Sequence, residues 1–200
     1  MLYSIEIALR SGLFDSGVWV STEDPAIAKI AWAAGAKVHP RQKALAQNDV
    51  GTQEVMRAAL LELYPPRTDY KMPVLACCIY ATAPLMTVED LRAGLELVAE
   101  GPTPYAYSVG PDGKDAGQWY WGLSSAFVDE VPLDHPHTKH LTIAEHRVCD
   151  INTYEDWERA ERLYRDMRQA ACQHNLQVVP NAIPEMVHLR CTSCGFSPPT

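Results

Sequence analysis

Three short segments of the sequence carry the side chains best suited to chemistry. They are residues 21–24 (Ser-Thr-Glu-Asp), 81–84 (Ala-Thr-Ala-Pro) and 147–152 (Arg-Val-Cys-Asp-Ile-Asn). Ligands of open parallel sheets bind beyond the carboxyl ends of the strands, so these segments are expected to meet at one crevice. A carboxylate there can hold Mg²⁺ against substrate phosphates because the ion prefers oxygen ligands, and Asp150 is the candidate. The alternative, which the residues alone favour, is that Asp150 is an ordinary polar residue of the turn before a helix.

Histidines and cysteines offer two further candidate metal sites. His135, His137 and His140 lie close together and could bind a transition metal, but an intervening proline and polar neighbours fit a solvated loop better. Cys191 and Cys194 form a lone C-x-x-C, whereas a structural zinc site needs further cysteine or histidine ligands. Neither cluster therefore predicts a metal site.

The remaining cysteines and motifs exclude several enzyme classes. Cys77 and Cys78 are neighbours within an apolar run and are expected to be reduced, buried thiols. The sequence contains no nucleophile elbow, H-E-x-x-H, P-loop or G-x-G-x-x-G. The sequence therefore gives no support for the hydrolases, zinc proteases and nucleotide-binding enzymes that depend on those motifs.

Composition and charge predict a cytoplasmic protein. The 200 residues are 47% hydrophobic and 21% charged, which is typical of a globular chain. Lys and Arg number 17 against 25 Asp and Glu, for a net charge of −8, so nucleic acid is not an expected partner. The longest apolar run, residues 73–86, is shorter than the roughly 20 residues of a membrane span, and the first ten residues lack a signal-peptide pattern. We therefore expect no membrane association.

Strand-like and helix-like stretches alternate, which predicts an α/β fold with a mostly parallel sheet and flanking helices. Strands are expected at 18–21, 74–80, 105–109 and 118–121. The near-continuous apolar run at 74–80 is typical of a central strand buried on both faces. One domain is expected over residues 1–174, followed by a loosely attached tail over 175–200.

Capping residues predict where four helices begin. Asp24, Thr87 and Thr153 are expected N-caps, and a further helix should begin near Thr52. Gly35 should take a left-handed conformation after the first of these helices. The residues expected to face the core at helical spacing are Ile27, Ile30, Ala31 and Ala34, then Val55, Met56, Leu60 and Leu63, then Leu91, Leu95 and Val98, and last Tyr154, Trp157, Ala160, Tyr164, Met167 and Ala171.

Longer blocks of the sequence resemble a known enzyme family. Residues 20–24 (Val-Ser-Thr-Glu-Asp), 27–28 (Ile-Ala) and 34–36 (Ala-Gly-Ala) resemble the first half of acylneuraminate-type cytidylyltransferases, which activate nine-carbon keto sugars with CTP. Blocks at 77–84, 115–122 and 147–161 are similar to the pseudaminic acid cytidylyltransferase branch, and the similarity runs in order from Leu2 to about Tyr164. The sequence is thus identified as a member of that family.

The resemblance implies a Rossmann-like, nucleotide-diphospho-sugar transferase-like fold and a reaction. CTP and pseudaminic acid would give CMP-pseudaminic acid and pyrophosphate, for cell-surface or flagellar glycans. Mg²⁺ and cationic groups would position the triphosphate and offset its developing charge. By position, the resemblance implies that Asp150 is catalytic and holds the metal with Asn152, that Ser21, Arg41 and Thr52 bind the nucleotide, and that Tyr80, Thr82, Asp115, Gln118 and Tyr120 bind the sugar.

Three departures from the family pattern bear on activity. The family begins with a strand and an Ile-Pro-Ala-Arg-Gly-Gly-Ser-Lys-Arg-Ile-Pro loop that holds the CTP phosphates, whereas residues 1–6 align after that loop. The first strand and loop are therefore expected to be lacking. The paired aspartates of the family become Asp150 and Asn152, which weakens magnesium binding. The family's homodimer uses a long arm, but here Val109 runs almost directly into residues 115–117, so dimerisation by that route is not expected.

These departures leave two interpretations of activity. Either the reading frame was taken from an internal Met, or the gene is a truncated relative, and we expect the 200-residue chain to turn over CTP weakly or not at all. The alternative function is a non-catalytic protein that binds a sugar or partner through an aromatic surface of Trp119, Tyr120 and Trp121, although strand packing also accounts for these residues. The Ala-Thr-Ala-Pro and Asp-Ala-Gly-Gln blocks argue against a different keto sugar, such as sialic or legionaminic acid.

Overall fold

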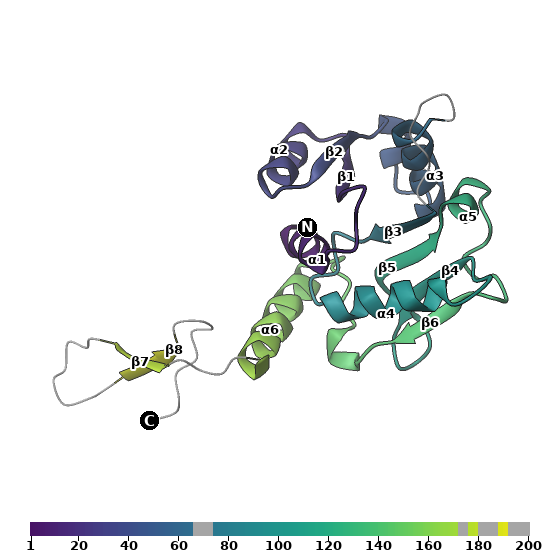
Figure 1. Cartoon of the computed structure of the whole chain (residues 1–200). Coiled ribbons are helices and arrows are strands. Elements are labelled where there is room, and N and C mark those ends of the chain that lie inside the picture. Colours follow the sequence, from purple (N-terminus) through teal and green to yellow (C-terminus); the bar gives the residue numbers. More distant parts are fainter. Residues whose placement is uncertain (66–73, 172–175, 180–187, 192–200) are drawn as a thin grey trace. The chain divides into compact units, whose positions relative to one another are not determined.

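The computed structural model describes residues 1–65, 74–171, 176–179 and 188–191 (Figure 1). These residues belong to two compact units, Met1–Asp150 and Ile151–Thr200, and each unit is described by itself. The domain boundary that we predicted near residue 174 lies inside the second unit and stays a prediction.

A four-stranded sheet forms the centre of the first unit. Its strand order is β3 (Leu75–Ile79), β5 (Asp115–Leu123), β4 (Tyr105–Val109) and β6 (Lys139–Thr142). Strand β5 runs antiparallel to both β3 and β4, while β4 and β6 are parallel, so three of the four strands share one direction. A separate two-stranded sheet pairs β1 (Trp19–Thr22) with β2 (Lys37–Pro40) in parallel. The predicted α/β class is confirmed, and β5 is the one strand of the larger sheet that runs against the rest.

The helices of the first unit follow the predicted caps. They are α1 (Leu2–Ser11), α2 (Pro25–Ala33), α3 (Thr52–Leu63), α4 (Val88–Ala99) and α5 (Ser124–Val128), with short 3₁₀ turns η1 (Lys43–Ala46) and η2 (Glu145–Arg147). The Asp24 carboxylate accepts the backbone N–H groups of Ala26 and Ile27, which confirms the N-cap of α2. Thr87 and Asp90 form a reciprocal capping box at α4, and Gly35 has the predicted positive φ of 90°.

Two apolar layers cover the four-stranded sheet. On one face Leu91 and Val98 of α4 pack with Trp119 and Trp121, and on the other Leu60 of α3 packs with Tyr105, Ala126 and Phe127. Helix α4 approaches the sheet closely at Gly94, where an added Cβ would lie 2.4 Å from the Trp119 ring. Trp119, Tyr120 and Trp121 are 0%, 3% and 2% exposed, so they pack in the core and do not form the aromatic binding surface of the alternative function.

Several expectations about burial were wrong. Strand β3 was expected to be a central strand, but it is an edge strand with half-buried residues. A continuous apolar run indicates that both faces of a strand are covered, but it does not show whether both edges are paired. Ile27 and Ile30 of α2 are 38% and 46% exposed, whereas Ala31 is the buried residue of that helix. His140 is exposed, as expected of a solvated position, but it lies in β6 and pairs with β4 instead of lying in a loop.

The second unit holds α6 (Tyr154–Ala171) and a two-stranded antiparallel sheet of β7 (Leu176–Val179) and β8 (His188–Cys191). The Thr153 hydroxyl and the Asp156 backbone and carboxylate form the predicted cap of α6. Tyr154 and Trp157 are 73% and 51% exposed, so the predicted core stripe of this helix was wrong at those positions, because periodicity defines a face and not what covers it. Cys194 lies outside the described residues.

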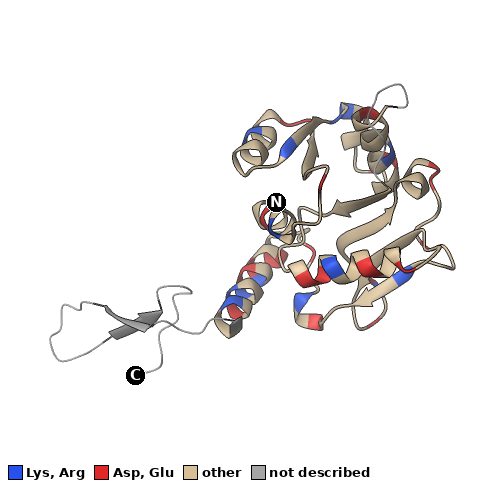
Figure 2. Ribbon diagram, in the orientation of Figure 1, with Lys and Arg blue, Asp and Glu red and all other residues tan. Residues whose placement is uncertain are grey.

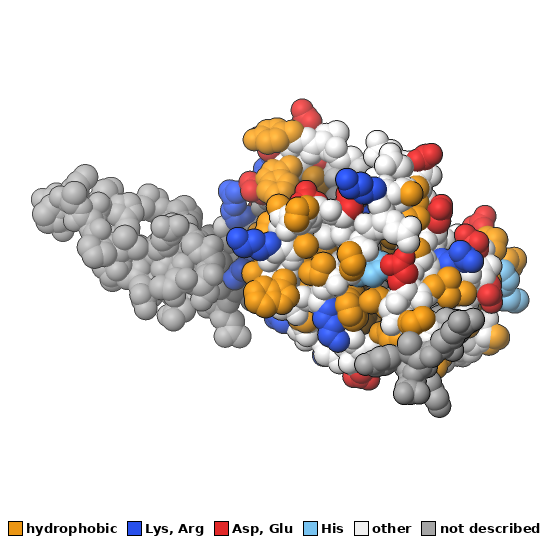
Figure 3. All heavy atoms as spheres, turned by 90° about the horizontal axis from the view of Figure 1, so that it is seen from above, with side chains coloured by type: hydrophobic (Ala, Val, Ile, Leu, Met, Phe, Trp, Pro, Cys, Tyr) orange, Lys and Arg blue, Asp and Glu red, His pale blue; other side chains and the backbone are white. Residues whose placement is uncertain are grey.

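Charges alternate along α6 and along the solvent side of α4 (Figure 2). Within the described residues, no helix is long and apolar enough to cross a bilayer. Seen from above, hydrophobic side chains interrupt the charged surface of the first unit (Figure 3). The exposed apolar residues of this unit include Trp19, Ile27, Ile30 and Trp32.

Candidate functional site

Ser21 lies at the end of β1 in a hydrogen-bonded row with two other side chains. Its Oγ is 3.0 Å from Nδ1 of His39, and Nε2 of His39 is 2.9 Å from Oε2 of Glu62 on α3. His39 is 4% exposed, and hydrogen bonds from His39 and Gln42 hold the pKa of Glu62 below its ordinary value. These hydrogen bonds fix the Ser21 hydroxyl between the two-stranded sheet and α3.

Arg41, which was also assigned to the nucleotide, lies next to Ser21. Its Nη2 donates to the Ser21 carbonyl at 2.7 Å, and its Nε is 3.5 Å from Oε2 of Glu23. The Arg41 side chain as a whole is 27% exposed, although its Nε is buried. A planar cation held in this way suits a phosphate, which accepts paired N–H donors.

Thr52, assigned to the nucleotide, meets Tyr80, assigned to the sugar. Thr52 is the first residue of α3, and its hydroxyl forms a hydrogen bond with the Tyr80 hydroxyl. Tyr80 follows β3 and its ring lies 5.3 Å from that of Tyr120 on β5. The two predicted subsites are therefore contiguous.

Tyr120 and Asp115 form a hydrogen-bonded pair on β5. The Tyr120 hydroxyl donates to Oδ2 of Asp115 at 2.6 Å, and the Gly117 N–H donates to Oδ1 at 2.8 Å. Burial and this bond to a carboxylate raise the pKa of Tyr120, so the phenol stays a donor at neutral pH. Asp115 itself is exposed and can face a polar ligand.

Four neighbouring rings form what we call the aromatic row. In the order of strands β3, β5, β4 and β6, they are Tyr80 directly after β3, Tyr120, Tyr107 and His140. The centroid distances are 5.3 Å from Tyr80 to Tyr120, 5.6 Å from Tyr120 to Tyr107, and 4.6 Å from Tyr107 to His140. Aromatic neighbours on adjacent strands stabilise a sheet and fix each other's rotamers. The row connects the sugar-side residues to the far strand β6.

Gln118 and Thr82 are less directly placed for ligand binding. Gln118 is fully buried, and its amide donates to the Arg147 carbonyl at 2.7 Å, while its Oε1 has no hydrogen-bond partner among the described residues. Thr82 is half-buried in the turn after β3. Their assignment to the sugar stays a prediction.

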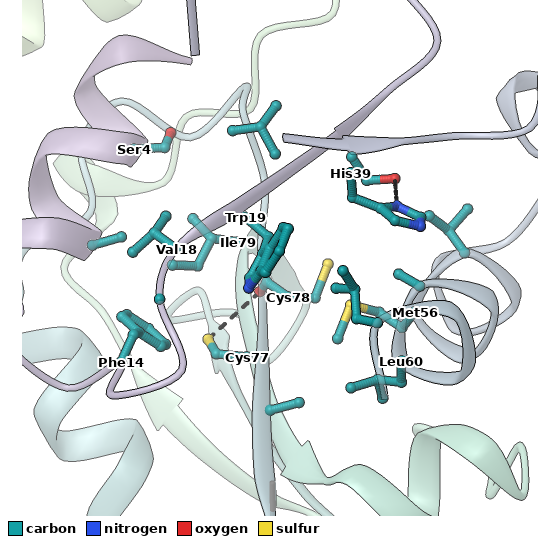
Figure 4. A pocket seen from close by; sticks show the side chains of 18 of the residues that line it. Ser4, Phe14, Val18, Trp19, His39, Met56, Leu60, Cys77, Cys78 and Ile79 are labelled. Atoms are coloured by element: carbon teal, nitrogen blue, oxygen red, sulfur yellow. Dashed lines mark hydrogen bonds between the residues drawn. The ribbon is translucent and has the colours of Figure 1, made fainter. Parts of the chain in front are cut away.

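A cavity of about 880 Å³ lies beside these residues (Figure 4). Ser21, His39, Thr52 and Tyr80 line it on the polar side, and mostly apolar side chains of α1, β1, α3 and β3 line the rest. Cys77 and Cys78 of β3 face it as thiols outside any disulfide, and burial raises the pKa of Cys78 to about 12.

Comparisons with known proteins agree with this architecture. A family model described as Cytidylyltransferase matches residues 1–120. The chain belongs to this cytidylyltransferase family. It is 28% identical over 204 residues to the pseudaminic acid cytidylyltransferase of Campylobacter jejuni subsp. jejuni serotype O:2, covering 84% of this chain and 86% of that protein. It is 33% identical over 105 residues to N-acylneuraminate cytidylyltransferase A of Danio rerio, covering 52% of this chain and 23% of that protein.

A solved structure shares the fold of this cytidylyltransferase. The crystal structure of Rv0371c from Mycobacterium tuberculosis H37Rv aligns with a TM-score of 0.54 and 16% identity, covering 78% of this chain and 80% of that one. At this identity the likeness supports the Rossmann-like α/β fold alone.

Asp150 is the last residue of the first unit of the cytidylyltransferase, and side-chain contacts of Arg147 and Gln118 hold the segment before it. The Arg147 side chain pairs with Asp90 of the α4 capping box, and the Arg147 carbonyl accepts from Gln118. Gly117 has a φ of +62°, and a Cβ there would be in ordinary contact, at 3.6 Å, with the Asp150 carboxylate. Asn152 belongs to the second unit, where its backbone N–H donates to Asp156 at 3.1 Å.

The donor set fits magnesium only with help from a substrate. Mg²⁺ is commonly held by one or two carboxylates together with substrate phosphates and water. Asp150 supplies one carboxylate, and no group of three His, Cys, Asp or Glu side chains suited to a metal occurs among the residues that the structure describes. A triphosphate would therefore have to supply most of the remaining oxygens.

Sequence reasoning missed His39 and Glu62. No motif contains them, and they meet only in the folded chain, where His39 on β2 reaches Glu62 on α3. The available signal was the position of His39 directly before Pro40 and Arg41, at the end of an apolar stretch.

Proposed function

We propose that this cytidylyltransferase transfers CMP from CTP to pseudaminic acid, in the cytoplasm, for glycan biosynthesis. The single observation that supports this substrate is the 28% identity to a protein named pseudaminic acid cytidylyltransferase, which extends over 84% of the chain. The contiguity of the predicted nucleotide and sugar residues, joined by the bond between Thr52 and Tyr80, is consistent with it.

The reaction is a nucleotidyl transfer. The anomeric hydroxyl oxygen of the sugar forms a bond to the α-phosphorus of CTP, and the bond from that phosphorus to the oxygen bridging to the β-phosphorus breaks. Pyrophosphate leaves with the electron pair, and the hydroxyl proton passes to solvent. Catalysis of this kind depends mainly on positioning and on offsetting charge.

The site residues divide between these two tasks. Arg41 would contact the phosphates, while its bond to the Ser21 carbonyl limits its motion. Asp115, aligned by Tyr120 and by the Gly117 N–H, would accept hydrogen bonds from sugar hydroxyl or amide groups. When bound, magnesium would offset charge on the phosphates, and Asp150 would be its ligand from the first unit.

A product assay tests the proposal. The full chain is incubated with CTP, Mg²⁺ and either pseudaminic acid or N-acetylneuraminic acid, and pyrophosphate and the CMP-sugar are measured by coupled assay and mass spectrometry. We expect CMP-pseudaminic acid, formed more slowly than the roughly 1–10³ per second of ordinary enzymes because one metal carboxylate is replaced by Asn152.

The controls separate the reaction from contamination. Asp150→Asn should abolish product, and Ile30→Ala, an exposed change on α2, should not alter it. Product from N-acetylneuraminic acid alone, or no CMP-sugar from either substrate at high enzyme concentration, would refute the proposed function.

A further inference from the structure

Ser21, His39 and Glu62, which we call the triad, bring a serine, an imidazole and a carboxylate into one line of hydrogen bonds. The proposed function makes no use of the Ser21 hydroxyl or of the two side chains behind it. The two hydrogen bonds, of 3.0 and 2.9 Å, have the length that proton transfer between side chains requires. Hydrolases on unrelated folds activate a serine with the same order of groups, which is recognised by geometry and not by sequence position.

The partners of His39 determine which of its ring nitrogens carries the proton. Hydrogen bonds from His39 and Gln42 lower the pKa of Glu62, which keeps this carboxylate ionised at neutral pH. An ionised carboxylate only accepts hydrogen bonds, so Nε2 of His39 carries the proton shared with Glu62. The lone pair of the neutral ring is then on Nδ1, which faces the Ser21 hydroxyl. The hydroxyl therefore donates to His39, as a serine does before it attacks.

Two members of the triad are held in place, while the third is partly solvated. His39 is 4% exposed, and the Ser21 carbonyl accepts from Nη2 of Arg41 at 2.7 Å. The Glu62 side chain is 39% exposed, so water weakens its effect on the imidazole. We therefore expect Glu62 to contribute less to the activation of Ser21 than His39 does.

Ser21 is accessible from the cavity of about 880 Å³. Its side chain is half-buried, and Figure 4 shows His39 at the wall of this cavity, which Met56 and Leu60 of α3 also line. Small-molecule sites combine a mostly apolar lining with a few polar groups in this way. The lining suits a short aliphatic chain beside the serine.

A donor for developing negative charge lies on Ser21 itself. Lys37 donates to the Val18 carbonyl at 2.8 Å and Arg41 to the Thr22 carbonyl at 3.0 Å, so Val18 and Thr22 face β2. Backbone groups of alternate residues point to opposite sides of a strand, so the Ser21 N–H points away from β2. This N–H, with the positive charge of Arg41 nearby, can stabilise the oxygen that becomes negative when a carbonyl is attacked.

We propose that Ser21 is the nucleophile of a second activity, the hydrolysis of carboxylic esters with a short aliphatic acyl group. His39 is the base, and Glu62 is a positioning residue that orients the imidazole. This activity goes beyond the proposed function and does not depend on it.

The hydrolysis has two steps. The Ser21 oxygen forms a bond to the ester carbonyl carbon, while its proton passes to Nδ1 of His39. The bond from that carbon to the alcohol oxygen then breaks, and the alcohol leaves with this proton. In the second step a water oxygen bonds to the same carbon and gives its proton to His39. The Ser21 oxygen leaves, takes the proton back, and the carboxylic acid is released.

The first test labels the full, unmodified chain with an alkyl fluorophosphonate, which bonds to activated serines, and locates the label by peptide mass spectrometry. Ser4 is the internal control, because it lines the same cavity but donates to the Tyr80 carbonyl instead of to an imidazole. We expect the label on Ser21 and not on Ser4.

The second test measures hydrolysis of p-nitrophenyl butyrate. Ser21→Ala and His39→Gln should each lower kcat at least about a hundredfold, the effect typical of losing a nucleophile or a general base. Glu62→Gln should lower kcat about tenfold at an unchanged KM, because it alters the base and not the acyl site. Glu54→Gln removes the same charge from the first turn of α3 and should change neither constant.

The location of the label decides the matter, because His39→Gln can also unfold the chain. No label on Ser21 at millimolar fluorophosphonate, or equal labelling of Ser4, would overturn the proposal. Ester hydrolysis that persists unchanged in Ser21→Ala would overturn it as well, since the reaction would then belong to other side chains. The formation of a CMP-sugar is measured separately and is not affected by any of these outcomes.

Discussion

Removing one oxygen atom, in Tyr120→Phe, should destabilise the protein measurably. The Tyr120 side chain is 3% exposed, and its hydroxyl donates to the Asp115 carboxylate at 2.6 Å. Hydrogen bonds to charged groups contribute about 1.5–3 kcal/mol. Asp115 is exposed and water can replace the lost donor, so we expect the lower end, about 1.5 kcal/mol of unfolding free energy. The ring stays in place, so packing in the aromatic row is unchanged.

Urea unfolding followed by tryptophan fluorescence measures this loss, since the midpoint shifts at constant slope when only stability changes. The matched control is Tyr107→Phe, a neighbour in the aromatic row whose hydroxyl makes no hydrogen bond to Asp115 in the described structure. If Asp115 binds the sugar, Tyr120→Phe should also raise the KM for pseudaminic acid about tenfold and leave the KM for CTP unchanged. Equal stability losses in the two variants would show that the bond to Asp115 contributes nothing, and the reasoning would fail.

Three further predictions concern packing, pH and metal. Gly94→Ala should lower the urea midpoint despite the better helix propensity of alanine, because the new Cβ would lie 2.4 Å from the buried Trp119 ring; an unchanged midpoint would contradict the close approach. Burial raises the pKa of Cys78 from 9.0 to about 12, so the unfolded chain loses the thiol proton at a lower pH than the folded chain. The unfolding free energy should therefore fall as pH rises from about 9 toward 12. Cys78→Ala should flatten this fall, which is measured as the thermal midpoint against pH. Asn152→Asp should lower the Mg²⁺ concentration for half-maximal product formation roughly tenfold by adding a carboxylate, whereas Asn152→Ala should not, and equal effects of both would exclude a role in metal binding.

Local chemistry accounts for the parts of the fold that sequence predicted well. The caps at Asp24, Thr87 and Thr153 depend on a side chain and backbone amides two or three residues away, so they can be identified without knowing the fold. The strand at 105–109 and the helix that begins at Thr52 also appear as predicted. These features are determined within a single segment.

Tertiary pairing accounts for the parts that sequence did not predict. An apolar run such as 75–79 looks the same at the edge and at the centre of a sheet, so the edge position of β3 was missed. The contact of His39 with Glu62 depends on residues 23 positions apart in two different elements. Some site residues matched to the family lie together, as Ser21 with Arg41 and Tyr80 with Tyr120. Arg41 and Tyr80 directly follow β2 and β3, which pair with the strands that hold Ser21 and Tyr120.

The aromatic row has a consequence for how sugar preference could diverge among relatives. Because each ring rests on the next, from Tyr80 through Tyr120 and Tyr107 to His140, replacing one ring by a smaller residue would leave a hole that its neighbours fill by changing rotamer. A substitution on β6 would then shift the phenol that aligns Asp115, two strands away. Selection for a new sugar should therefore replace these four positions as a set, and their joint variation would be the evolutionary trace of that coupling.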